Sequence, residues 1–482
     1  MRPRWRQAGK QLARVMVVYK LIGFGMPVLK PVNKGGNGLG KGDLTSILIN
    51  NVELYSVLTS GLICVSISSC ILNSSSLWST QMASPSIEVF PVGNGDMTLI
   101  TTKNNKKILI DCYRRAGKEY DYLEDRLRER LNTDEDGRLY VDVFVLTHPD
   151  ADHITGFDTM FHTGVPDGWS DKSNKIFINE IWSSPRVFRR ATAKGADGNN
   201  PLCDDARVFN TEAKRRVQLY RDSKHIGDAG NRIIILSSDE DGKTDDIQPI
   251  VADLYTLFGD MSGIDDNSLN AFLLAPADKQ EVAEDEEELT KNNSSAIIRF
   301  DLTNTIYNDE LACNITHTHS VLIGGDAEVK CWEVLHDKLK ATGQLDELAY
   351  DVLLAPHHCS WRSLSNDSES QCEDPQLNES AHAALSFANP SALILCSSQE
   401  FGEKTPPSQR ARDEYEKILK DKKGGEFLAV VEQGEDADGN PNSLMITFTE
   451  GKPKKTKKTQ KRDFSTVANP AAVSKSGKST YA

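Results

Sequence analysis

The stretch VFVLTHPDADHITGF, residues 143–157, joins an apolar run to a dense group of polar side chains. Residues 143–146 are all apolar, which is the pattern of a strand that lies in a core. Two histidines and two aspartates follow almost at once: His148, Asp150, Asp152 and His153. Burying charged groups of this kind is costly unless a partner compensates them. A divalent metal ion is the simplest partner, so the stretch predicts a metal site at the end of a core strand.

The composition is that of an ordinary globular protein. Of the 482 residues, 38% are hydrophobic and 26% are charged, which fits one large domain or roughly two to three smaller ones. The net charge of −14 argues against a protein that coats nucleic acid non-specifically, but it leaves open an enzyme with a local basic channel. The nine cysteines include no C-x-x-C pair, so we expect a reducing compartment, the cytoplasm, and no disulfide framework.

Both ends of the chain differ from its middle. Residues 1–42 contain nine basic residues and no acid, and an uncharged run follows them. We expect residues 1–84 to be an extension, either disordered or a targeting segment, with Met82 as an alternative start of the folded protein. Anchorage in a membrane through residues 54–72 is the alternative to a cytoplasmic protein, although serines dilute this run. Residues 451–482 are expected to be a basic disordered tail.

Residues 85–450 are expected to form one domain in which strands alternate with helices. Strands are predicted at 87–92, 97–101, 107–111, 141–146, 175–182, 232–236, 295–301, 319–325, 350–356, 391–398, 426–433 and 443–449. Helices are predicted near 123–131, 204–222, 328–341, 377–387 and 408–421. This alternation indicates an α/β or α+β protein with two sheets and helices outside them. The long polar stretches around 186–290 are interpreted as insertions and solvated loops.

Three further motifs place polar groups where a predicted strand ends. Asp326 follows the strand of SVLIGGDAE (320–328), and His357 and His358 follow that of DVLLAPHHCSWRS (351–363). An aspartate, Asp96, lies in the Gly-rich turn of VFPVGNGDMTLI. Taken alone, each is more simply explained as a turn residue, a helix cap or an ordinary histidine pair. Strand ends at one edge of a sandwich can nevertheless converge on one cleft.

Together these motifs resemble those of the metallo-β-lactamase fold superfamily, and most closely those of the hydrolase domain attached to ComEC-type DNA-uptake channels. The family's central His-x-Asp-x-Asp-His corresponds to residues 148–153, and its opening V-G-x-G-D corresponds to residues 92–96. Its L-I-D, its bridging G-D and its closing H-H-G-S-x-x-S correspond to residues 109–111, 325–326 and 357–363.

The resemblance spans residues 87 to about 450 and has three departures from the family pattern. Cys359 stands where the family usually has glycine, and Asn94 replaces the usual glutamine. Residues 397–407 lack the histidine that relatives tend to carry there. We expect Cys359 to be a neighbour of the ligand histidines and not a nucleophile.

The resemblance implies a four-layer αββα sandwich around two divalent metal ions. The implied ligands are histidines and aspartates at strand ends: His148, Asp150, Asp152, His153, Asp326, His357 and His358. The first two, with one of the His357/His358 pair, would hold one ion, and Asp152 and His153 the second, with Asp326 between the ions. Asp152 and His153 are also the implied catalytic residues. The oxygen-rich ligand set shifts the preference from Zn²⁺ toward Mn²⁺ or iron, with zinc still open.

Two classes of function remain open at this point. One is a metallohydrolase that cleaves phosphodiesters, a phosphodiesterase or nuclease with nucleic acid or a nucleotide as substrate. The other is a hydrolase of small esters, lactones or thioesters, or a catalytically weak metal-binding module for interaction. Six arginines near the motif loops are candidates for guiding a phosphate backbone: Arg114, Arg115, Arg186, Arg189, Arg190 and Arg362.

Overall fold

The computed structural model describes residues 84–185, 202–239, 242–276, 294–308, 311–402, 406–420, 422–449 and 451–456, together with the backbone of four short strands before them. The chain divides into two compact units, Met1–Ser79 and Thr80–Ala482. In the first unit the described strands form two antiparallel pairs, β1 (Ser46–Ile49) with β2 (Val52–Tyr55) and β3 (Leu58–Thr59) with β4 (Leu62–Ile63). Apart from these strands, the predicted extension, including its possible membrane segment, lies outside the described residues.

The second unit contains a ten-stranded mixed sheet in the order β12-β11-β10-β9-β7-β6-β5-β20-β21, with β8 paired to β9. Its strands are β5 (Ser86–Val89), β6 (Thr98–Thr101), β7 (Lys107–Ile110), β8 (Asn132–Thr133), β9 (Leu139–Leu146), β10 (Phe177–Ser183), β11 (Arg232–Leu236), β12 (Val251–Ala252), β20 (Leu444–Thr449) and β21 (Lys452–Lys455). The strands β7, β9, β10, β11 and β12 run parallel, because helices and long loops connect them.

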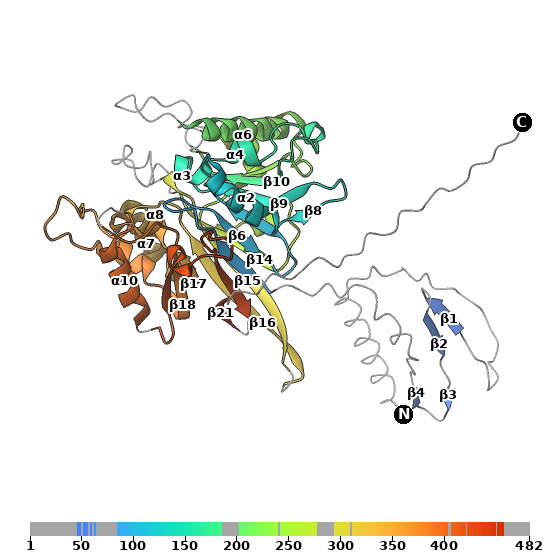
Figure 1. Cartoon of the computed structure of the whole chain (residues 1–482). Helices are drawn as coiled ribbons and strands as arrows, with labels where there is room; N and C mark the ends of the chain where they lie inside the picture. The colour runs from blue at the N-terminus through green and yellow to red at the C-terminus, as the bar shows by residue number, and fades with distance from the viewer. Residues whose placement is uncertain are drawn as a thin grey trace, which may run out of the picture. The chain divides into compact units, whose positions relative to one another are not determined.

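A seven-stranded mixed sheet has the order β13-β14-β15-β16-β17-β18-β19. Its strands are β13 (Thr256–Leu257), β14 (Leu269–Ala275), β15 (Ile297–Asn308), β16 (Cys313–Ile323), β17 (Tyr350–Leu354), β18 (Ala388–Cys396) and β19 (Glu426–Ala429). The strands β13 to β16 are antiparallel, and β16 to β19 are parallel. The long hairpin of β15 and β16 extends beyond its neighbours (Figure 1).

Helices pack on each sheet through separate hydrophobic clusters. The main ones are α2 (Asp121–Arg128), α6 (Asp204–Ser223), α7 (Val329–Thr342), α9 (Glu379–Leu385) and α10 (Gln409–Lys420). The helices α2 and α6 share one cluster with the ten-stranded sheet, and α7, α9 and α10 share another with the seven-stranded sheet. The first two lie near β9 and β10 in Figure 1. Each helix contributes an apolar stripe, as an amphipathic helix on a sheet must.

A third hydrophobic cluster is made by residues of both sheets. Val143 and Val145 of β9 belong to it, as do Phe300 of β15 and Val321 of β16. The Trp182 ring of β10 stacks on Phe300, with 6.2 Å between the ring centroids. The protein is therefore a mixed α+β structure in which two mixed sheets share a core.

Most of the predicted elements are confirmed, and two differences stand out. The predicted strands and helices each overlap one in the structure, and the helix predicted at 204–222 is α6. Residues 269–275, which the sequence analysis assigns to insertions and loops, instead form β14, which pairs with β15. The predicted disordered tail begins too early, because residues 452–455 form β21 and pair with β20. Among the described residues no helix combines the length and the apolarity that a bilayer span requires.

Candidate metal centre

Four strand ends bring the predicted site residues to one edge of the two sheets. The strand β9 ends two residues before His148, and the neighbouring parallel strand β7 ends just before Asp111. In the other sheet, β16 ends three residues before Asp326, and its parallel neighbour β17 leads into His357 and His358. Parallel strands point their carboxyl ends the same way, which is where open α/β sheets place their ligand sites.

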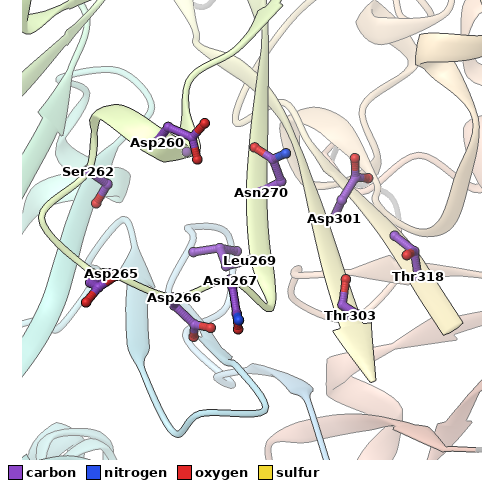
Figure 2. Close-up of a pocket in the computed structure, with 11 residues that line it drawn as sticks. Asp260, Ser262, Asp265, Asp266, Asn267, Leu269, Asn270, Asp301, Thr303 and Thr318 are labelled. Atoms are coloured by element: carbon purple, nitrogen blue, oxygen red, sulfur yellow. The ribbon is translucent and has the colours of Figure 1, made fainter. Parts of the chain in front are cut away.

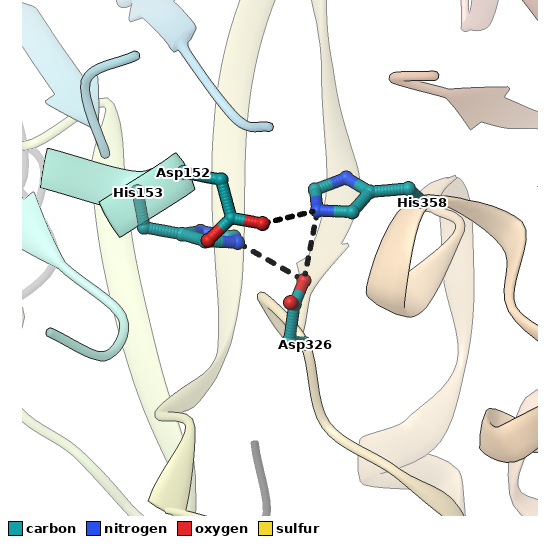
Figure 3. A group of neighbouring side chains, drawn as sticks. All are labelled: Asp152, His153, Asp326 and His358. Atoms are coloured by element: carbon teal, nitrogen blue, oxygen red, sulfur yellow. Dashed lines mark ion pairs between the residues drawn. The ribbon is translucent and has the colours of Figure 1, made fainter. Parts of the chain in front are cut away.

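Asp326 lies at the centre of this group and is buried. Its Oδ1 atom is 3.0 Å from His153 Nε2 and 3.4 Å from His358 Nε2. Its Oδ2 atom is 3.8 Å from both His148 Nε2 and His357 Nε2. Figure 3 shows His153 and His358 converging on Asp326 from different elements. The two oxygens of one carboxylate therefore face two different pairs of histidines.

The remaining two predicted ligands, Asp150 and Asp152, lie on opposite sides of this carboxylate. Asp150 Oδ2 is 3.8 Å from His148 Nε2, and Asp152 Oδ2 is 3.6 Å from His358 Nε2. The Asp152 side chain is 36% exposed, whereas that of Asp326 is 4% exposed, so Asp152 stands at the mouth of the site. The structure thus brings all seven sequence-predicted ligands together around Asp326.

Several buried polar atoms of this group lack a hydrogen bond. Among the described residues, His148 Nε2, His153 Nε2, His358 Nε2 and Asp326 Oδ1 are buried and make no hydrogen bond of good geometry, although His153 Nε2 and Asp326 Oδ1 are 3.0 Å apart. Leaving one buried polar atom unsatisfied costs about 1–3 kcal/mol, so a concentration of them needs an explanation. The ligand atoms of Asp152, His153, Asp326 and His358 all lie within 4.8 Å of one another, a spacing that one cation can span. The donor set fits a divalent metal.

The opposite ring nitrogens of three histidines have partners that fix how the rings point. His153 Nδ1 donates to Asp111 Oδ2 at 2.7 Å, and His358 Nδ1 donates to the Ser397 carbonyl at 3.2 Å. His148 Nδ1 lies 3.2 Å from the Thr147 hydroxyl. These contacts at Nδ1 point Nε2 of each ring toward Asp326, the arrangement found in metal-ligating histidines.

Asp111 is a functional residue that the predicted ligand set omits. It is fully buried and accepts from Thr147 N at 2.8 Å, from Thr147 Oγ1 at 2.6 Å and from His153. Its φ of +57° is rare outside glycine, asparagine and aspartate. Its position after a strand, in the L-I-D motif, indicates a residue near the site. Nothing in the sequence, however, shows that its carboxylate accepts a hydrogen bond from His153.

The Gly-rich turn before β6 places Asp96 on the far side of the histidines. Asp96 Oδ2 is 3.9 Å from His153 Nδ1, and its Oδ1 is 3.7 Å from His358 Nδ1. Burial raises the pKa of Asp96 to about 6, despite the opposing charges of the two histidines. A side chain at Gly95 would meet the Tyr113 ring at 2.1 Å and the Asp152 carbonyl at 2.8 Å. Glycine is required there for the turn to approach the site.

Three consecutive residues after β17 adopt left-handed backbone conformations. The φ angles of His357, His358 and Cys359 are +50°, +52° and +62°. Each such residue costs about 1–2 kcal/mol, and strain of this kind is concentrated at functional sites. The Cys359 thiol is buried, and burial raises its pKa well above the usual range, which disfavours the nucleophilic thiolate.

Replacing Cys359 by glycine is expected to change turnover by less than about tenfold, or about 1.4 kcal/mol. Glycine removes the left-handed strain but leaves a small cavity, and the two effects oppose each other. Turnover and metal content of Cys359→Gly should be measured beside Cys396→Ala, which removes another buried thiol. Loss of turnover at unchanged metal content in the glycine variant alone would indicate thiol chemistry.

The charges of the metal-free centre are mutually stabilised. Burial opposes protonation of His358, but Asp326, Asp152 and Asp96 outweigh it and raise its pKa to about 9. The pKa of His153 is likewise raised well above its usual value, against burial, by Asp326 and Asp111. Burial would raise the pKa of Asp152, but contact with His358 and the charge of His153 lower it to about 2. Without metal, the two protonated histidines therefore supply the positive charge that balances these carboxylates.

Metal binding at pH 7 is expected to release protons. His358, whose pKa is about 9 without metal, is protonated at pH 7 and must lose its proton to bind a metal. Affinity should therefore rise with pH until about 9 and level off above it. Titration calorimetry in two buffers of different ionisation enthalpy measures the released protons. Equal heats in both buffers at pH 7 would contradict the expected release of protons.

A separate polar pocket lies away from this group. It has a volume of about 550 Å³ and is bordered by Asp260, Asp265, Asp266 and Asp301 (Figure 2). None of the predicted ligands lines it. Two of its acids are engaged, since Asp266 accepts from Asn104 at 2.6 Å and Asp301 pairs with Arg299 at 3.0 Å. Its acidic lining makes it a poor place for a phosphate.

The comparisons with known proteins add no assignment: no model of a protein family matches the chain, and no curated protein is significantly similar to it.

Proposed function

We propose that this protein is a metal-dependent hydrolase of the metallo-β-lactamase fold that cleaves phosphodiesters. The observation that carries the proposal is the convergence of four histidine Nε2 atoms on the Asp326 carboxylate, at 3.0–3.8 Å. The three hydrophobic clusters support the corresponding αββα sandwich, because one lies between the sheets and the others lie under helices. The assignment to this family in the proposal rests on the motif resemblance.

The two oxygens of Asp326 divide the ligands into two sets. His148, Asp150 and His357 lie on the Oδ2 side and would hold one ion. Asp152, His153 and His358 lie on the Oδ1 side and would hold the second. Asp326 would contribute one oxygen to each. The mixture of imidazole and carboxylate suits Zn²⁺ and Mn²⁺, and the proposal includes both.

Divalent ions in such a site supply Lewis acidity and a water of lowered pKa. The chain's own residues complete the chemistry. Asp152 stands at the mouth of the site, and its carboxylate, which is ionised at neutral pH, can accept a proton from an attacking water. Asp111 and Thr147 hold His153 and His148 in fixed orientations, which limits the reorganisation that the reaction requires.

Positive charge near the metal centre favours phosphodiesters over small neutral esters as substrates. Arg115 and Arg362 are exposed, follow motif loops of the site, and have no carboxylate partner among the described residues. A negatively charged substrate would gain from both, whereas a neutral ester or lactone would not. The small-ester hydrolase and the weak metal-binding module remain the alternative outcomes.

The test is a hydrolysis panel run with metal analysis. Purified protein is assayed on single-stranded DNA, RNA, cyclic dinucleotides, bis(4-nitrophenyl) phosphate and a set of lactones, each with Mn²⁺, Zn²⁺ or EDTA. Metal-dependent cleavage of phosphodiesters supports the proposal. Cleavage of lactones alone would replace it with the small-ester function. Metal binding without any hydrolysis would leave an interaction module.

A further inference from the structure

The structure separates the arginines that lie near the motif loops. Three of them, Arg186, Arg189 and Arg190, lie outside the described residues. Arg114 contacts Asp121 and is 3.8 Å from Glu124, so its charge is neutralised locally. Arg115 and Arg362 are exposed and lack a carboxylate partner among the described residues. Two cations near the site therefore remain available for a ligand.

Of these two, Arg115 is held in a defined position. Its Cζ atom is 4.3 Å from the ring centroid of Tyr120 and 5.6 Å from that of Tyr113. Its Nη2 atom is 3.5 Å from the Val92 carbonyl oxygen. These contacts fix the guanidinium without neutralising its charge. The Arg362 guanidinium has no comparable contact within the described part of the chain.

The Arg115 guanidinium lies beside the metal centre and not within it. The Tyr113 ring packs so closely on Gly95 that a Cβ there would be 2.1 Å from it, and the same Cβ would be 2.8 Å from the Asp152 carbonyl. Arg115 lies beyond this ring, at the Val92 end of the turn that Asp96 completes. A Cβ at Gly93, two residues before Gly95, would be 3.7 Å from Arg115 Nη2, so Arg115 and Asp152 contact the same turn.

We propose that Arg115 binds a phosphate next to the one that is cleaved, so that the substrate is a single strand of nucleic acid and not a small phosphodiester. This inference rests on the proposed function. The ligands around Asp326 would engage the reacting phosphate, and Arg115, on the turn that also contacts Asp152, would engage the phosphate next to it. Tyr113 and Tyr120 flank the guanidinium, and aromatic rings beside a cation are typical of sites for unpaired strands.

Binding without metal tests this directly. Anisotropy of a short fluorescent oligodeoxythymidylate is measured in EDTA with the full chain, Arg115→Ala, Arg115→Lys and Arg126→Ala. The alanine variant should bind about ten- to a hundredfold more weakly, the range for loss of a charged hydrogen bond. For Arg115→Ala, the slope of log Kd against log salt concentration should be smaller by about 0.7. Arg115→Lys should restore the wild-type slope. Arg126 is the matched control, because it also lies over a tyrosine, at 5.3 Å from Tyr122, but pairs with Asp436 at 3.0 Å.

Kinetics with Mn²⁺ distinguish this inference from the function on which it rests. Arg115→Ala should raise KM for the oligonucleotide by a similar factor and lower kcat/KM for bis(4-nitrophenyl) phosphate by much less, because that ester has no second phosphate for the guanidinium to bind. An alanine variant that binds and cleaves the oligonucleotide like the wild type overturns the role of Arg115. So does an equal loss on both substrates. If the wild type cleaves neither substrate but binds the strand through Arg115, the proposed hydrolase fails and the binding site stands.

Discussion

Replacing Asp326 by alanine is expected to remove most of the bound metal. Its two oxygens face the two histidine sets at 3.0–3.8 Å, so the substitution takes a ligand from both positions at once. Loss of a residue that only hydrogen-bonds to a ligand typically costs 10–100-fold in metal affinity, and loss of a shared ligand should exceed that. Elemental analysis of protein purified without chelator should show about two ions per chain in the wild type and well under one in Asp326→Ala.

The matched control for this change is Asp351→Ala. Asp351 is an aspartate of β17 that accepts from Ser320 N at 2.9 Å and from Asn389 at 3.1 Å, but it faces no ligand of the centre. It should keep the full metal content. Wild-type stoichiometry in Asp326→Ala would show that the metal, if any, binds elsewhere. If the wild type bound neither Mn²⁺ nor Zn²⁺, the protein would be a fold without a metal site.

Asp152→Ala is expected to lower turnover by about 10²–10⁴-fold or more, the loss typical of removing a general base. The carboxylate stands at the mouth of the site, and the variant lacks both a metal ligand and the acceptor for the proton of the attacking water. Folding should be little affected, because the side chain is 36% exposed. Turnover is measured on the best substrate of the panel, with circular dichroism as the check on folding.

Asp158→Ala is the control for Asp152→Ala. It removes a carboxylate whose side chain is 55% exposed and whose one ion pair within the described residues is with Lys175, so turnover should not change. A folded Asp152→Ala protein that cleaves phosphodiesters at the wild-type rate would falsify the proposed two-metal mechanism. Metal content measured on the same sample shows whether ligation or proton transfer was lost.

The sequence predicts the strand ends well because apolar runs and polar motifs adjoin each other there. Residues 143–146 and 350–354 are apolar or nearly so and are followed at once by His148 and by the histidine pair, so both the strand and its chemistry can be read locally. Whether these ends meet depends on pairing between distant strands, which local patterns do not contain. The resemblance to a family supplied that step, and the structure brings the same residues together.

The features that were missed depend on tertiary contacts. The strand β14 reads LNAFLLA, an apolar run that polar stretches on both sides obscured. Asp111 carries no local sign of its role, because its partners Thr147 and His153 are brought to it only when β7 pairs with β9. The different surroundings of Arg114 and Arg115 could not be predicted either, since the fold alone decides which side chains lie around each of two adjacent arginines.

The division of the ligands between the two sheets has a consequence for biosynthesis. His148, Asp150, Asp152 and His153 follow a strand of the ten-stranded sheet, whereas Asp326, His357 and His358 follow strands of the seven-stranded sheet. A nascent chain that has emerged only as far as α6 holds four of the seven groups and lacks the carboxylate between them. The complete site can form only after β17 has been translated. Metal capture at the proposed site would therefore come late in the synthesis of each molecule, and it would join two parts of the chain that are made at different times.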